Sequence, residues 1–259
     1  MAFTSVEITS MLGIYFWPFV RIAAMVMSVP IIGTRMLPAR IRILIAIVLT
    51  VAIAPLVSPA PPIEIISLNG LLMVIYQVMI GVAMGFILSL VFGAFVLCGQ
   101  IIAMTMGLGF ASLNDPITGV VVPTVGQFYT IFVTLAFFSL NGHHVLFEVM
   151  ADSFHGLPLG MQMISMEAVW AILSWASQMF AGAMLIALPA VGAMLVVNLG
   201  FGIMTRAAPQ LNIFAVGFPV IMTVGFVVIL VSLPSVVPQF ERLLAEAYAL
   251  MRNVVGAPL

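Results

Sequence analysis

A stretch of 50 residues, 65–114, contains no Asp, Glu, Lys or Arg. A segment without charge over that length must lie in lipid or deep inside other protein, because water-facing protein surfaces carry ionisable side chains. The whole chain follows the same tendency, with 64% hydrophobic and 6% charged residues, whereas soluble domains carry roughly a quarter charged residues. The sequence therefore predicts an integral membrane protein.

Six apolar blocks can be drawn along the chain, separated by segments rich in Arg, Pro and polar residues. They cover residues 8–30, 43–57, 68–106, 120–140, 168–205 and 213–237. At about 1.5 Å per residue, the third block would measure nearly 60 Å as one helix, about twice the hydrocarbon core of a bilayer. The third and fifth blocks are therefore either pairs of short helices or single helices that extend beyond the membrane. Both arrangements require partner proteins or a cavity.

The connection between the fourth and fifth blocks, residues 141–167, is the most polar part of the chain. Four potential metal ligands in it would share one face of a helix: His144, Glu148, Asp152 and His155. Metal binding is one interpretation of this spacing. A wet face at a boundary between apolar blocks explains the same pattern, and we predict no metal site. The tail after residue 237, beyond the last apolar block, is expected to be mildly amphipathic.

Two features of the apolar blocks predict helix packing. Small residues recur at every fourth position of the third block, at Gly81, Gly85, Ser89 and Gly93, and such a stripe lets helices approach closely in lipid. Arg21 lies in the middle of the first block, where a charge near the bilayer centre costs roughly 3 kcal/mol. Arg21 should therefore face protein, either lining a path or, as we favour, tying helices together through carbonyl groups.

A segment rich in methionine and glycine ends the third block and has the best claim to a functional role. Its candidate residues are Met104, Met106, Gly107, Leu108, Gly109, Phe110 and Ala111. Methionine is unbranched and deformable, so it can seal against irregular surfaces, and glycine supplies backbone freedom. A compliant plug and ordinary core packing both remain open on the residues alone, because 20 Met are scattered along the chain.

Catalysis finds no support in the sequence, which lacks a nucleophile elbow, a phosphate-binding glycine loop and a metalloprotease helix motif. We predict a protein that is not an enzyme and binds no cofactor, and the net charge of −1 argues against nucleic acid. A transporter for small solutes or ions is the first alternative, although it would usually place a carboxylate inside a span. A purely structural scaffold is the second.

Several segments, in order over nearly the whole chain, resemble the FliR family of the flagellar type III export apparatus. The most specific is RAAPQLNIFAVGFP, which starts at Arg206. The weaker ones are YFWPFVR at residues 15–21, residues 30–42, MGLGFA at 106–111, NGH at 141–143 and FHGLP at 154–158. Related injectisome export proteins share much of this pattern and are the alternative within the same superfamily.

The resemblance implies a non-enzymatic subunit of a protein-export gate in the bacterial inner membrane, within the flagellar basal body. Such a subunit would assemble with FliP-like and FliQ-like subunits, contact a FlhB-like protein and membrane lipid, and help to form a pore for unfolded substrates. It also implies an all-α membrane fold of long, kinked helical hairpins. A FliP-like part, residues 1–165, would be fused to a FliQ-like part, residues 166–259.

The same resemblance assigns roles to the candidate residues. The plug loop of the family falls on residues 106–111. A cytoplasmic turn that would contact the FlhB-like protein falls on Arg206, Pro209, Gln210 and Asn212. Arg21 and the stripe of small residues would then serve packing within the assembly.

Overall fold

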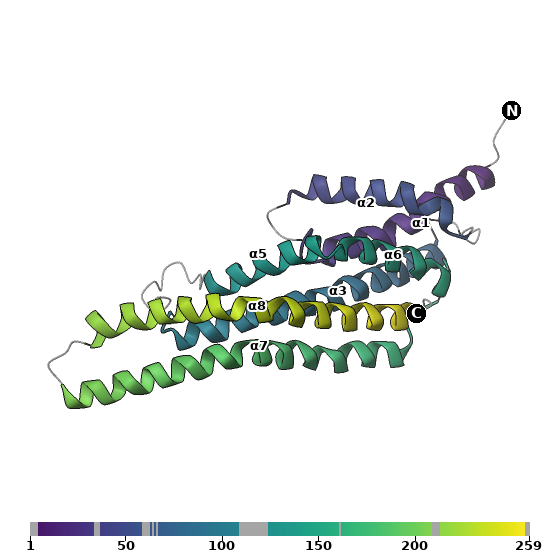
Figure 1. The fold of residues 1–259 in the computed structure, drawn as a ribbon. Helices are drawn as coiled ribbons and strands as arrows, with labels where there is room; N and C mark the ends of the chain where they lie inside the picture. Colours follow the sequence, from purple (N-terminus) through teal and green to yellow (C-terminus); the bar gives the residue numbers. More distant parts are fainter. Residues whose placement is uncertain are drawn as a thin grey trace. The chain divides into compact units, whose positions relative to one another are not determined.

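The computed structural model describes residues 5–33, 37–58, 63, 65, 67–108, 124–160, 162–208 and 213–256. In these ranges the chain forms α-helices, one short 3-10 helix and no strand, which confirms the predicted all-α class (Figure 1). The elements are α1 (Ser5–Ser28), α2 (Ala39–Ile53), η1 (Ala54–Leu56), α3 (Leu68–Thr105), α5 (Thr124–Ser139), α6 (Gly142–Gly156), α7 (Met166–Ala207) and α8 (Ile213–Val255).

The longest apolar blocks are single continuous helices. Helices α3, α7 and α8 contain 38, 42 and 43 residues, which corresponds to lengths of about 57–65 Å. Among the described residues, four helical segments are long and apolar enough to cross a membrane. The count rises to five if α5 and α6, which are bent by 70° relative to each other, form one broken span. The structure therefore favours long helices over pairs of short ones.

One block boundary expected from the sequence is wrong. The last apolar block does not end at residue 237, because α8 continues through Pro238 to Val255. The tail keeps a buried apolar stripe at helical spacing, and burial of such a stripe sustains a helix. Its members are Phe240, Leu243, Leu244, Ala247, Tyr248 and Met251.

The polar connection at residues 141–167 contains a helix, α6, although no apolar block covers it. Its buried side chains recur three and four residues apart, as on one face of an amphipathic helix. They are Leu146, Val149, Met150, Ser153 and Phe154. The charged and histidine residues between them lowered the mean hydropathy enough to hide this stripe.

The chain divides into two compact units. Unit 1 contains Met1–Val91, Phe137–Ala176 and Leu244–Leu259, and unit 2 contains Phe92–Ala136 and Ser177–Leu243. Several helices begin in one unit and end in the other. The FliP-like and FliQ-like parts, residues 1–165 and 166–259, are defined by likeness to other proteins and stay a prediction.

Each unit has its own apolar core. In unit 1, α2 lies along α1 (Figure 1), and Trp17, Ile22 and Met73 are buried. In unit 2, α7 and α8 run side by side in opposite directions (Figure 1). The ring of Phe240 packs edge-on against Phe92 and Phe95, with centroid distances of 5.9 and 5.6 Å. Such edge-to-face pairs add to the stabilisation from area burial alone.

Candidate functional site

Arg21 of α1 is completely buried in unit 1 and joins three segments of the chain. Its Nε donates a hydrogen bond to Oε1 of Gln77 on α3 at 2.8 Å. Its Nη1 donates to the carbonyl oxygen of Ser153 on α6 at 2.8 Å and to the hydroxyl of the same residue at 3.1 Å. Its Nη2 donates to the carbonyl of Leu157 at 2.8 Å. The guanidinium also lies 4.2 Å from the ring centroid of Phe154.

The acceptors around Arg21 are neutral oxygen atoms, so the contacts of this charge are hydrogen bonds and a cation–π contact. A planar guanidinium suits the site, because its donors form a rigid fork that reaches several acceptors at once. The Nε2 group of Gln77 has no hydrogen-bond partner in the described part of the chain. This arrangement holds α1, α3 and α6 together.

A second set of contacts in unit 1 joins α6 to the last turns of α8. The hydroxyl of Tyr248 donates to the carbonyl of Gly142 at 2.6 Å. A Cβ added to Gly156 would collide with the backbone of Val255 and Gly256. Arg252 also donates to Glu148 at 3.3 Å, although partly exposed ion pairs of this kind contribute little to stability.

The four potential metal ligands on α6 do not converge. His144, Glu148 and His155 are exposed, and Asp152 is half-buried. No group of three or more His, Cys, Asp or Glu side chains in the described part of the chain could hold a metal ion.

The glycine stripe of α3 contacts different helices along its length. In unit 1, a Cβ at Gly81 would collide with the carbonyl of Arg21, and one at Gly85 would collide with Ser28. Both glycines therefore allow α3 to touch the α1 backbone. In unit 2, a Cβ at Gly93 would lie 2.9 Å from the sulfur of Met179 on α7. The Ser89 hydroxyl donates to the carbonyl of Phe86 within α3.

The methionine- and glycine-rich segment begins at the end of α3 in unit 2. Gly107 has a φ of 77°, and its N–H donates to the carbonyl of Met104 at 3.1 Å. The N–H of Leu108 donates to the carbonyl of Ala103 at 3.0 Å. These bonds form a Schellman motif, in which a glycine in the left-handed region ends a helix. Gly107 therefore stops α3 at a defined residue.

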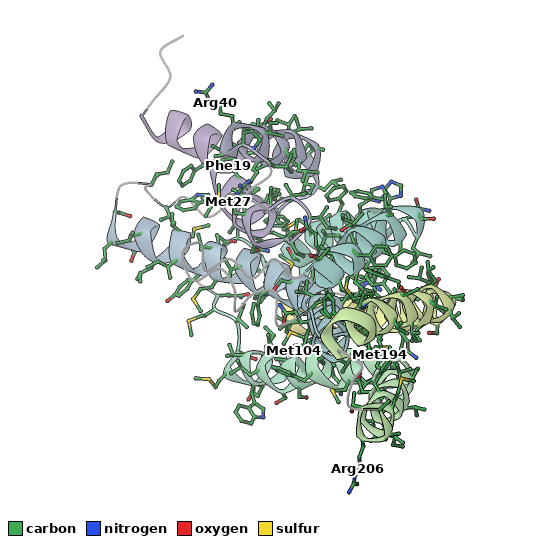
Figure 2. The ribbon with its side chains drawn as sticks, turned by 90° about the vertical axis from the view of Figure 1, so that its left-hand side faces the viewer. Phe19, Met27, Arg40, Met104, Met194 and Arg206 are labelled. Carbon is green, nitrogen blue, oxygen red and sulfur yellow. The ribbon has the colours of Figure 1, made fainter. Side chains whose placement is uncertain are left out.

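Neighbouring helices hold this end of α3 in place. Met106 is fully buried, and its side chain lies so close to Gly225 of α8 that a Cβ there would be 2.6 Å from it. The side-chain amide of Asn198 on α7 donates to the carbonyl of Thr105 at 3.3 Å. Met104, in contrast, is 74% exposed, and Figure 2 shows its position on α3.

Some predicted site residues lie outside the described part of the chain. They are Gly109, Phe110 and Ala111 of the methionine- and glycine-rich segment, and Pro209, Gln210 and Asn212 after α7. Arg206 is described, and it lies in the last turn of α7. It is exposed and points away from the helices (Figure 2).

Comparison with known proteins identifies the family. Residues 12–247 match the family described as bacterial export proteins, family 1. The chain belongs to this family. The matched range contains Arg21, the glycine stripe, the methionine- and glycine-rich segment and the residues that follow α7.

Known relatives of this chain are similar to it over nearly their full lengths. The flagellar biosynthetic protein FliR of Escherichia coli is 34% identical over 98% of this chain and 97% of the relative. The protein of the same name from Pectobacterium carotovorum is 33% identical over the same shares. The one from Bacillus subtilis is 28% identical over 92% of this chain and 93% of the relative. The predicted FliR family is therefore confirmed.

Gly99 makes a close helix contact that the predicted stripe of small residues does not include. Gly99 of α3 lies against Gly126 of α5 in unit 2, and a Cβ at Gly99 would be 2.6 Å from the Gly126 nitrogen. Gly99 is six residues after Gly93, so it breaks the four-residue register of the stripe. Pairing it with Gly126 would have required knowledge of which helices are neighbours.

Proposed function

We propose that this chain is a subunit of the flagellar type III protein-export gate, located in a bacterial inner membrane and in the flagellar basal body. With FliP-like and FliQ-like subunits it forms the pore through which unfolded substrates pass, and it contacts a FlhB-like protein. The segment from Met104 to Ala111 helps to close that pore. The chain itself catalyses no reaction.

The length of the apolar surface on α7 is the observation that carries this proposal. Large apolar side chains are exposed from Trp170, 70% exposed, to Ile203, 71% exposed. These two residues are about 50 Å apart along the helix at 1.5 Å per residue. A hydrocarbon core of about 30 Å would cover that length only at a tilt above 50°, whereas membrane helices tilt by about 0–40°. Part of this surface therefore needs other protein subunits to cover it.

The geometry at the end of α3 supports a role in closure. Met106 and Gly107 fix where the helix ends, while Met104 in the preceding turn is exposed. The chain after Gly107 therefore starts from a fixed position at the end of α3. The exposed side chain of Met104 beside it is deformable and can seal against a neighbour. The names of the relatives direct the proposal to flagellar export rather than to an injectisome.

Co-purification tests the assembly. We expect a pull-down in mild detergent, from cells that express this chain with FliP-like and FliQ-like subunits, to give one discrete hetero-oligomer by native mass spectrometry. A stable monomer or homodimer that ignores both subunits would contradict the gate and favour the transporter.

Replacing the closing segment tests its role in the assembled gate. We expect an equally long Gly/Ser segment at residues 108–111 to leave the hetero-oligomer intact and to raise dye efflux from reconstituted vesicles well above background. The replacement keeps Met106, whose buried side chain packs against Gly225, and Gly107, which ends α3. Lost assembly would instead indicate a scaffold, and unchanged efflux would show that residues 108–111 do not close the pore.

A further inference from the structure

Helix α2 differs from the other candidate spans in length. The apolar segment Ala39–Leu56, which joins α2 and η1, has 18 residues. It would measure about 27 Å, close to one hydrocarbon core of about 30 Å. Helices α3, α7 and α8 are about twice as long and need partners along part of their surface. The Ala39–Leu56 segment needs none to cross a bilayer once.

The outward surface of this segment is made of large apolar side chains. Those at least 41% exposed are Ile41, Ile43, Leu44, Ile47, Val48, Val51 and Leu56. The polar group in the middle of the helix, the hydroxyl of Thr50, is buried and donates to the carbonyl of Ala46 at 2.6 Å. The exposed face between the two ends of the segment therefore presents no polar side chain.

Small residues occupy the opposite side of the same segment. Ala46, Thr50 and Ala54 recur every fourth position and are all buried in unit 1, where α2 packs against α1. Interfaces between membrane helices are rich in small residues, because close backbone approach drives association in lipid. Bulky branched side chains outside and small ones inside thus separate a lipid-facing side from a protein-facing side.

The charged residues of this segment are confined to its first turn. Arg40 is exposed and points away from the helix (Figure 2). Arg42 is turned back, and its Nε and Nη2 both donate to the carbonyl of Leu37 at 3.0 and 2.8 Å. An exposed arginine at the end of an apolar span can reach the headgroup region, where its guanidinium forms strong bonds with phosphate.

We propose that α2 is the lipid-facing span of unit 1: its exposed apolar face contacts the acyl chains, and Arg40 binds the phosphate of an anionic phospholipid at one end. The occupant of this face is the bilayer and not another subunit. The inference rests on the membrane class of the protein and does not require the export gate.

A depth profile tests the lipid contact. In the full chain with its single cysteine, Cys98, changed to Ala, cysteines replace Ile41, Val48 and Leu56 one at a time and carry a bimane label. Phospholipids with a nitroxide near the headgroup or deep in the acyl chain then quench the fluorescence. We expect the deep quencher to act most strongly at Val48 and several times more weakly at Ile41 and Leu56. A flat profile would overturn the proposal.

The same labels distinguish this inference from the gate itself. In the complex with FliP-like and FliQ-like subunits, Val48 should keep its quenching by lipid. Loss of that quenching on assembly would show that a subunit covers α2 and would overturn the inference while supporting the gate. If no complex forms, the gate fails, and the profile of the chain alone still decides the orientation of α2.

Substitution of Arg40 tests the headgroup contact. Native mass spectrometry of the chain with phosphatidylglycerol and phosphatidylcholine would measure the preference for the anionic lipid. We expect Arg40→Gln to lower this preference about fivefold, because one basic residue near an anionic surface contributes about 1 kcal/mol. Arg40→Lys should retain most of it. An Arg40→Gln variant that binds phosphatidylglycerol as well as the original chain would overturn this part of the proposal.

Discussion

We expect the Arg21→Met variant to lose about 3 kcal/mol of the free energy of unfolding. The substitution leaves Oε1 of Gln77 and the carbonyl of Leu157 without the donors they have now. An orphaned buried acceptor such as that of Gln77 costs about 1–3 kcal/mol, and the half-buried carbonyl of Leu157 falls at the lower end of this range because water can reach it. The carbonyl of Ser153 keeps the N–H of Leu157 as a partner, so it adds little. Removing a buried charge offsets part of this loss, so the net destabilisation is smaller than the combined cost of the two unpaired acceptors.

Unfolding of the purified chain in mixed micelles, titrated with a denaturing detergent, would measure this change. Arg206→Met is the matched control, because it removes the same side chain from an exposed position in the last turn of α7 and should change stability by less than about 0.5 kcal/mol. Arg21→Lys should fall between the two, since an ammonium group lacks the planar fork that reaches several acceptors. An Arg21→Met variant as stable as the control would contradict a structural role for this charge.

The position of Arg21 in an apolar block was enough to predict that it faces protein. Its partners were not predictable in the same way. Gln77 and Ser153 lie 56 and 132 residues further along the chain, and neither belongs to a recognisable motif. A local pattern can show that a buried charge needs acceptors, but only the packing of helices decides which residues supply them.

Helix boundaries were likewise only partly predictable from the sequence. The absence of charge over residues 65–114 predicted a helix, and α3 fills most of that stretch. It could not decide between one long helix and two short ones, because both bury the same side chains. Hydropathy also missed α6, whose polar face carries histidine and acidic side chains, and it ended the last block too early. In both places the helix depends on a buried stripe rather than on mean hydropathy.

The methionine- and glycine-rich segment shows where composition leaves two roles open. Glycine at position 107 fits a flexible loop as well as a helix end, and backbone freedom alone does not distinguish the two roles. The positive φ and the two backbone hydrogen bonds show that Gly107 ends α3. The sequence contained a signal for this, because a glycine directly after an apolar helical block commonly takes the left-handed conformation that ends a helix.

We expect the Gly99→Val variant to be destabilised by about 3 kcal/mol, the upper part of the usual range for overpacking. A Cβ at Gly99 would lie 2.5 Å from the Cα of Gly126 and 2.6 Å from its nitrogen. These are backbone atoms of α5, so no side-chain rotation can relieve the collision. The two helices of unit 2 must move apart, which forfeits contacts on both sides of the interface.

The same titration with a denaturing detergent measures this variant, and Gly192→Val on α7 provides its control. A Cβ at Gly192 would meet nothing within 4 Å, so this substitution should change stability by less than about 0.5 kcal/mol. Gly99→Ala should already cost more than Gly192→Val, because the first added carbon atom makes the collision. Equal stability of the two valine variants would contradict the close approach of α3 and α5 at Gly99 and Gly126.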